Sequence, residues 1–485
     1  MRSAFFGSIL LCVMVGNLWL VHTTVAQRPL ITRGTSFLEN ETDDDREERE
    51  LMERRRFVEQ IFDAEERERQ MELLERVEAS RQNRLARRQR DEVGADLFHF
   101  PRLRPQFLNE GFCQLFDGHT DFGWRIQTKG PHGGGGFTFG QGEIRNNDPQ
   151  HPSMIYTAIP FGDIELRFHY WAERGAEFLL LMNTPPNPAN LDVDCYAFVL
   201  NSSLSSRPRG LLLGRHGLSL AELRAMRDSL DNPTSQEEGS WHTAIVTIAG
   251  NDIRFWLDTR SATPHFIEEP LPPGHIGFLV TRGRVRIQNI LWRPSQPDAI
   301  FDVDSATSAP PPWRRFEGSN LDVVTDPQGG HNVFRLYAGS VESREVYTNY
   351  VLQMQYRQGN TSGRSSLFVR SLPGRQNTGY EISLQNFPRR QDRETDRGVD
   401  AGGFLGIKDA RYIRAQDQEW NHLTAVVMGR QMKTWVNGVP VCYIEDRRTI
   451  STPTGPFLGP GTIRLSVPPE NTDFQFRHLT VSPVL

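Results

Sequence analysis

The chain has 485 residues, of which 37% are hydrophobic, and a formal net charge of −5 at pH 7. This length accommodates two domains of ordinary size and an additional segment. So small a net charge argues against a nucleic-acid binder or a protein that captures polyanions, because both depend on a strong basic excess.

The N-terminus has the order of a secretory signal peptide. Arg2 precedes an apolar run over residues 4–21, and Thr24-Val25-Ala26 follows as a small-residue cleavage site. We predict that residues 1–26 are removed, which leaves a secreted or periplasmic protein with no membrane partner. The alternative is an uncleaved membrane anchor, because the apolar run approaches the length that spans a bilayer.

Residues 27–108 are predicted to form a charged helical arm and a linker. Residues 41–93 are mostly Glu, Asp, Arg and Gln, and this stretch contains neither Pro nor Gly. Glu and Arg recur at three- and four-residue spacing, which favours a helix. Two interpretations stay open: a weak coiled coil or docking arm that mediates self-association, or a solvated spacer or disordered stretch.

Beyond Phe98 the sequence predicts an all-β structure. Pro, Gly and aromatic residues become frequent, and short runs alternate between apolar and polar residues. The residues at 164, 166, 168 and 170 (Ile, Leu, Phe, Tyr) are echoed at 350, 352, 354 and 356 (Tyr, Leu, Met, Tyr). The echo continues in order, so we predict a first sandwich over residues 109–295 and a second over residues 298–485. Residues 218–227 are predicted to be a helix that only the first copy contains.

Three cysteines follow the predicted cleavage site: Cys113, Cys195 and Cys442. An odd number without short spacing argues against a disulfide framework or a zinc site. One bridge is compatible with an oxidising compartment. Buried free thiols are the favoured alternative.

Several motifs occur in a characteristic order. Residues 115–124 read Leu-Phe-Asp-Gly-His-Thr-Asp-Phe-Gly-Trp, residues 366–370 Ser-Leu-Phe-Val-Arg, and residues 379–384 Gly-Tyr-Glu-Ile-Ser-Leu. Glu-Trp-Asn follows at 419–421 and Trp-Val-Asn-Gly at 435–438. In this order they resemble the 3-keto-disaccharide hydrolase domain family, secreted β-sandwiches related to concanavalin A-like lectins and glucanases. The resemblance implies two tandem concanavalin A-like jelly-roll sandwiches, the first of them eroded in its middle.

The resemblance implies carbohydrate as the partner and cleavage of a 3-keto glycoside as the activity. The acidified C2 proton of such a sugar permits elimination across C1–C2 with a single base, and the paired carboxylates of an ordinary glycosidase are not evident. The alternative is a non-catalytic module that binds a glycan or a protein. No cofactor is indicated. Calcium is common in lectin-like sandwiches, but Asp192 and Asp194 alone do not make a site.

Side-chain alternation along strands selects the candidate site residues. A sandwich buries its apolar faces, so the polar faces are expected to line an outer groove that holds sugar. Glu381 is expected to be the catalytic base, with Arg370 as its partner. The residues expected to bind substrate are Gln353, Gln355, Ser383, Gln385, Trp420, Asn421 and Trp435. The alternative is that the polar stripe is an ordinary half-exposed sheet face and that the tryptophans belong to the core.

The first copy is expected to lack the catalytic function. Where the second copy has Arg370 and Glu381, the first has Asn183 and Ala197. We therefore expect the first sandwich to bind a ligand or only to support its neighbour.

Overall fold

The computed structural model describes residues 38–39, 71, 102–127, 136–146, 148–149, 151–186, 195–201, 239–258, 260–261, 265–269, 272–301, 312–326, 332–358, 365–376, 378–386, 399–448, 458–468 and 473–484. Residues 36–485 form one compact unit. The predicted signal peptide, the helix predicted at 218–227, Asp192 and Asp194 lie outside the described residues. Within the charged stretch 41–93, Met71 alone is described. No helix within the described ranges is long and apolar enough to cross a membrane.

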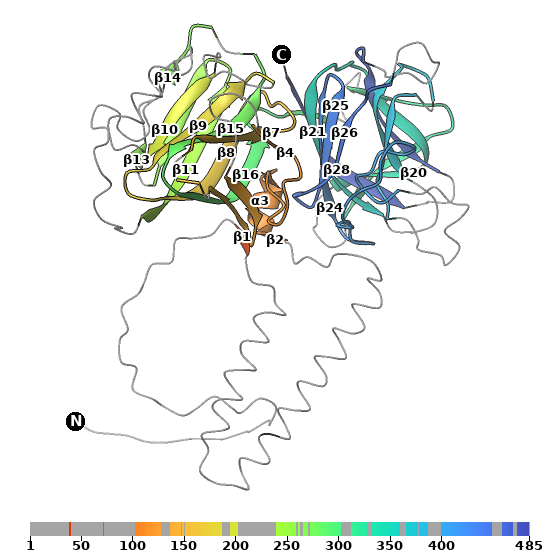
Figure 1. Ribbon diagram of the computed structural model, residues 1–485. Coiled ribbons are helices and arrows are strands. Elements are labelled where there is room, and N and C mark those ends of the chain that lie inside the picture. Colours follow the sequence, from red (N-terminus) through yellow and green to blue (C-terminus); the bar gives the residue numbers. More distant parts are fainter. Residues whose placement is uncertain are drawn as a thin grey trace, which may run out of the picture. The chain divides into compact units, whose positions relative to one another are not determined.

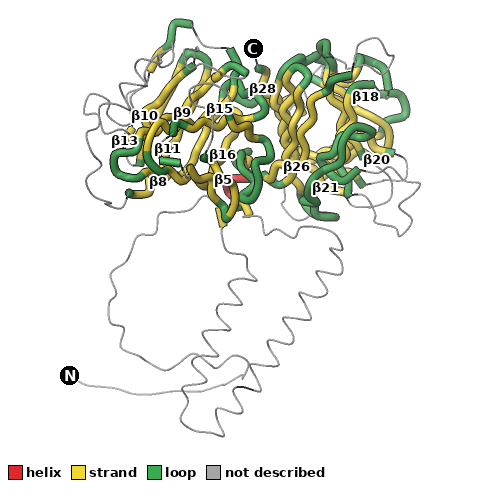
Figure 2. Tube along the Cα trace, in the orientation of Figure 1, coloured by secondary structure: helices red, strands yellow, loops and turns green. Residues whose placement is uncertain are grey.

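Antiparallel strands dominate the described residues (Figure 2). Among the elements with described bounds, α3 (Pro105–Asn109) is the one helix, and its Pro105 stands at the first helical position, where proline costs no hydrogen bond. The strands before the predicted joint are β1 (Leu38–Glu39), β2 (Arg102–Leu103), β3 (Cys113–Gln114), β4 (Trp124–Ile126), β5 (Phe137–Gly140), β6 (Glu143–Asn146), β7 (Ser153–Thr157), β8 (Ile164–Ala172), β9 (Glu177–Thr184), β10 (Tyr196–Asn201), β11 (Ser240–Ala249), β12 (Asp252–Leu257), β13 (Arg260–Ser261), β14 (His265–Phe266), β15 (His275–Arg282) and β16 (Val285–Pro294).

These strands form two layers, in addition to the small pair β1–β2 (Figure 1). One layer has the order β10-β9-β15-β7-β4. The other has the order β13-β12-β11-β8-β16-β6-β5, and β3 and β14 pair at its margins. Strand β8 shows why the layers pack: Ile164, Leu166, Phe168 and Tyr170 alternate along it and are fully buried, as the sequence pattern predicts.

The strands after the joint are β17 (Asp298–Phe301), β18 (Trp313–Arg315), β19 (Asn320–Thr325), β20 (Asn332–Ser343), β21 (Tyr350–Gln358), β22 (Ser366–Ser371), β23 (Tyr380–Ser383), β24 (Asn421–Met428), β25 (Gln431–Val436), β26 (Val439–Glu445), β27 (Thr462–Val467) and β28 (Phe474–Pro483). They follow the order β23-β22-β27-β20-β28-β21-β24-β25-β26. Strand β20 pairs with β28 through Phe334–Leu336 and with β27 through Gly339–Glu342. Gly339, with φ 90°, stands where the pairing with β27 begins, so β20 belongs to both layers of a second sandwich.

The structure confirms the predicted all-β class with jelly-roll-like sandwiches. The domain boundaries at 108/109 and 295/298 stay predictions. Non-glycine residues with left-handed backbone fall at matching places of the two sequence echoes, namely Asn183 (φ 57°) and Arg370 (φ 54°), Asp258 (55°) and Asn437 (49°), and Asn289 (54°) and His478 (50°). All three described cysteines are buried free thiols, as favoured above.

Candidate functional site

One face of the second sandwich carries a row of chemically active side chains. The row crosses β23, β22, β27, β20 and β18 at directly opposed positions: Glu381, Phe368, Arg464, Glu342 and Arg314. The intervening residues Ile382, Leu367, Leu465 and Val341 point the other way and are fully buried in the core. The row therefore lies on the outer face of this layer. We call it the outer row.

Glu381 is the half-buried end of the outer row. The Ser366 hydroxyl donates a hydrogen bond of 2.6 Å to its Oε1. The backbone carbonyl of Glu381 accepts from the Leu405 amide at 2.9 Å, so the carboxylate projects from a pinned edge strand. A carboxylate with one hydroxyl partner keeps lone pairs for a proton from substrate.

Arg464 is the cation nearest this carboxylate in the row. Its side chain is 1% exposed, and its guanidinium lies 4.2 Å from the Phe368 ring centroid. Nη1 donates to the Arg375 carbonyl, whereas Nε and Nη2 have no hydrogen-bond partner among the described residues. Burial lowers the pKa of Arg464, while Glu342 and then Glu381 act to raise it. Buried donors of this kind are costly unless a ligand satisfies them.

Glu342 lies next to Arg314 at the other end of the row, and both of its oxygens accept hydrogen bonds. It pairs with Arg314, and its oxygens also accept from the Gly374 amide and the Thr462 hydroxyl, each at 3.0 Å. With this acid saturated, Glu381 is the carboxylate of the outer row that is available for chemistry.

Hydroxyl groups form a second row beside the first. Ser383, Ser366, Ser466 and Ser340 oppose one another on β23, β22, β27 and β20. Ser340 donates to Ser466 at 3.0 Å. Small hydroxyl side chains leave room above a sheet and supply both donors and acceptors.

The corresponding face of the first sandwich is apolar. The residues opposed across β10, β9, β15 and β7 are Ala197, Leu181, Gly277 and Tyr156 in one row, and Val199, Leu179, Leu279 and Met154 in the next. Except for Gly277, they belong to one buried hydrophobic cluster. The described residues of this face include neither the carboxylate nor the guanidinium of the outer row.

The predicted pairing of Arg370 with Glu381 is wrong. The register of β22 against β27 shifts between Phe368 and Ser371, and Arg370 has φ 54°. Such a bulge breaks the alternation of side chains that placed Arg370 with Phe368. Arg370 is instead fully buried, where its guanidinium donates to the carbonyls of Thr348 and Gly429.

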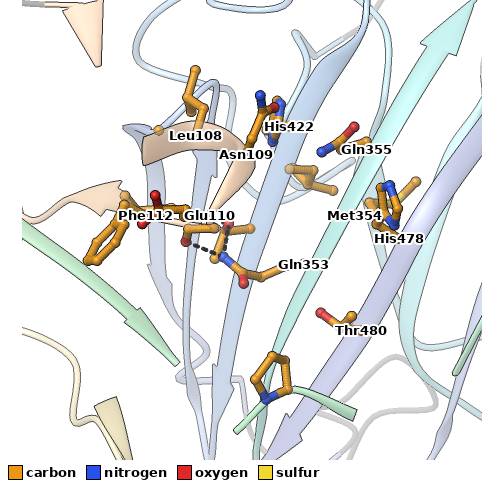
Figure 3. A pocket seen from close by; sticks show the side chains of 16 residues that line it. Leu108, Asn109, Glu110, Phe112, Gln353, Met354, Gln355, His422, His478 and Thr480 are labelled. Atoms are coloured by element: carbon orange, nitrogen blue, oxygen red, sulfur yellow. Dashed lines mark hydrogen bonds between the residues drawn. The ribbon is translucent and has the colours of Figure 1, made fainter. Parts of the chain in front are cut away.

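Gln353 and Gln355 do not share a groove with Glu381, which is a second correction. They lie on β21, in the layer opposite to β22 and β23, because alternation gives the face of a strand but not its layer. The Gln353 amide donates to the Gly111 carbonyl at 2.7 Å and to Thr424 at 3.1 Å. Both glutamines line a separate pocket of about 220 Å³ beside α3 (Figure 3).

Trp435 is not a stacking platform, because its ring is fully buried. Its indole N–H donates to the Gln114 carbonyl at 2.7 Å, and its ring packs 5.0 Å from Trp292. Trp420 is half-buried with its indole bound to Asp326 at 3.0 Å. The guanidinium groups of Arg477 and Arg357 lie 4.1 Å and 4.9 Å from its ring centroid.

Asn421, Ser383 and Gln385 have local structural partners. Asn421 is buried and its amide donates to the carbonyls of Gln416 and Glu419 at 2.8 Å and 3.0 Å. The Ser383 hydroxyl donates to the Gln385 carbonyl at 2.9 Å. Of the predicted site, Glu381 and Ser383 therefore share the outer face, and the remaining described residues lie elsewhere or face inward.

The sequence reasoning missed Arg464. Its strand reads Thr-Ile-Arg-Leu-Ser-Val over 462–467, so Ile463, Leu465 and Val467 mark the buried face and Arg464 the outer one. The signal was present, but only the pairing of β27 between β22 and β20 shows that Arg464 lies near Glu381.

A chain of hydrogen bonds in the first sandwich has the order of a catalytic triad. His242 Nε2 is 2.8 Å from the Ser240 hydroxyl, and its Nδ1 is 2.8 Å from Asp258. In the second sandwich the matching Asn437 bonds Asn421 and the His422 amide at 3.0 Å and 2.9 Å. Because a similar hydrogen-bonded arrangement forms at this position of the second sandwich without a nucleophile, we interpret the arrangement as a structural turn. Within the described residues no cluster of three His, Cys, Asp or Glu side chains could hold a metal ion.

No curated protein matches the chain. It is similar to a solved putative glycosyl hydrolase from Parabacteroides distasonis, with 14% identity, a TM-score of 0.30, and coverage of 40% of this chain and 98% of that one. It is also similar to a Bacillus licheniformis beta-glucanase, with 11% identity, a TM-score of 0.27, and 38% and 97% coverage.

A carbohydrate binding module from Bacillus subtilis matches with 11% identity, a TM-score of 0.23, and 35% and 95% coverage. The model of the 3-keto-alpha-glucoside-1,2-lyase-like domain matches residues 111–293 and again 323–482. These two segments together span more than half of the sequence, in the order in which the motifs were found. The chain belongs to the 3-keto-alpha-glucoside-1,2-lyase-like domain family.

Proposed function

We propose that the second sandwich cleaves a 3-keto glycoside on its outer row, with Glu381 as the base and Arg464 as the group that stabilises negative charge. The observation that carries the proposal is the buried Arg464 guanidinium, whose Nε and Nη2 lack partners among the described residues. Arg464 lies two strands from Glu381, and Phe368 stands on the strand between them. Adjacent strands lie about 4.8 Å apart, so the two charged groups are about 10 Å apart at the backbone. The proposal places one sugar ring over Phe368, which stands on the strand between them.

The chemistry needs one base and one anion-stabilising group. Glu381 removes the C2 proton, and the electron pair passes to the C3 oxygen as an enolate. When that pair returns to form the C1=C2 double bond, the bond from C1 to the aglycone oxygen breaks. The leaving oxygen takes the proton from Glu381. Arg464 donates to the enolate oxygen from a site without competing water.

Turnover of a 3-keto-α-glucoside tests this proposal, read as release of the aglycone and as ultraviolet absorbance of the enone. We expect Glu381→Gln to lower kcat by about 10²–10⁴-fold, because the amide cannot accept the proton. We expect Arg464→Met to lower kcat by about 10²–10³-fold. Glu419→Gln is the matched control, because this acid is exposed at the start of β24, and its kcat should equal that of the wild type.

Full activity in Glu381→Gln or in Arg464→Met would overturn these roles. The second candidate is a non-catalytic glycan-binding module, which the row of serine hydroxyls on the same face favours. Sugar binding that persists in wild type and Glu381→Gln, with no turnover in either, identifies that module.

We also propose that the protein is exported, on the strength of the apolar run and of Thr24-Val25-Ala26. Sequencing the N-terminus of the mature protein should give Gln27 as the first residue. Recovery of the uncleaved chain in the membrane fraction would instead support an anchor.

A further inference from the structure

The pocket beside α3 is built from two parts of the chain. The segment that follows α3 supplies one wall, and the outer faces of β21, β24 and β28 supply the floor (Figure 3). The polar side chains that line this junction pocket include Asn109, Gln355, His422, His478 and Thr480. It lies on the layer opposite to β22 and β23, so it does not include the outer row.

The wall of the junction pocket is fixed in place. The side-chain amide of Gln353 donates a hydrogen bond of 2.7 Å to the Gly111 carbonyl. The backbone amide of Gln114 donates to the Gly438 carbonyl at 2.7 Å. Gly111 has φ 82°, and a Cβ there would meet the Gln353 side-chain oxygen at 2.8 Å. Such a preformed wall lowers the entropic cost of binding a ligand.

The polar groups of the pocket are oriented and carry little charge. Arg477 Nε donates to Gln355 Oε1 at 2.8 Å, which turns the Gln355 amide nitrogen to the side of His422 (Figure 3). Burial, with Arg477 and His478, lowers the pKa of His422 to about 4. His422 is therefore neutral at pH 7 and presents both a donor and an acceptor.

The nearby full charges are already paired. The Arg477 guanidinium lies over the Trp420 ring at 4.1 Å and 3.9 Å from Asp326. The Glu110 carboxylate, at the rim, lies 3.7 Å from Arg293. A charged ligand thus finds here only counter-charges that are already paired, whereas a neutral polyol finds amide, imidazole and hydroxyl partners.

Size and apolar lining narrow the ligand further. The volume of about 220 Å³ is below the range of about 300–1,000 Å³ that holds drug-sized ligands. Leu108 and Pro297 add hydrocarbon to the lining, which suits the C–H face of a pyranose. We propose that the junction pocket binds a single neutral sugar residue, as a second carbohydrate site independent of the outer row.

Binding of four neutral methyl pyranosides (gluco, galacto, manno and xylo) to the full chain tests this inference, with glucose 6-phosphate as the charged comparison. Calorimetry should detect at least one of the four with Kd below about 10 mM. Gln355→Leu should weaken binding at least about tenfold. Asn109→Trp should do the same from the exposed rim, where folding is not at risk.

Two variants serve as controls. Gln106→Trp places the same bulk on an exposed position of α3 outside the pocket lining, and Glu419→Gln replaces an exposed acid that does not line the pocket. Both should bind the pyranosides as the wild type does. The inference is overturned if no pyranoside binds, if Asn109→Trp and Gln355→Leu bind as tightly as wild type, or if glucose 6-phosphate binds as tightly as the pyranosides.

Discussion

Lys433 is a buried amine enclosed by aromatic rings. Its Nζ lies 5.4 Å from the Phe122 centroid and 4.9 Å from the Trp435 centroid, and it has no hydrogen-bond partner among the described residues. Burial lowers its pKa to about 7, while Asp117 and the Cys113 thiol act in the opposite direction. Folding therefore carries a penalty for charging this amine.

The pH dependence of stability follows from that lowered pKa. Below pH 7 the amine is charged in both states, so the folded state bears the full penalty. Between pH 7 and about 10.5 only the unfolded state binds the proton, so stability rises with pH. At about 1.4 kcal/mol per pKa unit, the total is about 5 kcal/mol. We expect Lys433→Met to raise the free energy of unfolding at pH 7 by several kcal/mol and to flatten its rise toward pH 9.

Urea unfolding at pH 7 and pH 9 measures this effect. Lys408→Met is the control, because Lys408 is exposed, and it should keep the wild-type slope. A Lys433→Met variant that is less stable than wild type at pH 7 would show that the amine stabilises the fold.

At the scale of elements, one left-handed residue closes a turn in each sandwich. Asn437 Oδ1 accepts from the His422 amide at 2.9 Å, and its Nδ2 donates to the Arg414 carbonyl at 2.8 Å. Asp258 accepts from the Thr243 amide at 2.9 Å in the first sandwich. The Trp-Asn and Asn-Gly motifs thus encode a turn between strands and not a binding surface.

We expect Asn437→Ala to lower the free energy of unfolding by about 2–4 kcal/mol, because it removes these hydrogen bonds and strains a backbone of φ 49°. Asn437→Gly removes the bonds but tolerates the angle, so it should cost less. Chemical unfolding of both variants measures the difference. Equal stability of Asn437→Ala and wild type would show that these hydrogen bonds contribute nothing to the free energy of unfolding.

Alternation predicted the cores of these elements well and the candidate site only in part. The buried face of β8 follows directly from the apolar residues at every second position. The bulge at Arg370 has no sequence signature, because a left-handed arginine is unusual. The layer of β21 depends on long-range pairing that alternation does not contain, so Gln353 was misplaced while Glu381 and Ser383 were assigned to a common face correctly.

At the scale of the whole unit, each sandwich has its own hydrophobic cluster, and the cluster of the first sandwich extends onto the second. Val351, Val426, Met428, Trp435 and Val484 of the second belong to the same buried cluster as Trp292 and Phe161 of the first. Cys113 Sγ also lies 3.2 Å from the Thr424 hydroxyl, and burial raises the pKa of that thiol to about 12.

We expect Trp435→Ala to lower the free energy of unfolding by about 3–5 kcal/mol, because it leaves a large cavity between the sandwiches. Loss of this contact should also split a single unfolding transition into two, which calorimetry detects. Trp241→Ala is the control, since Trp241 is 41% exposed. A single transition at unchanged temperature in Trp435→Ala would contradict this role of Trp435 between the sandwiches.

The contrast between the two outer faces has a consequence for how the chain tolerates change. The first sandwich presents Leu179, Leu181 and Met154 where the second presents Ser366, Phe368 and Ser340. A comprehensive mutational survey should therefore show different effects of substitution on the two faces. Polar replacements at the aliphatic positions would lower the soluble yield and leave specific activity unchanged. Bulky replacements at the serines would lower specific activity and leave the soluble yield unchanged.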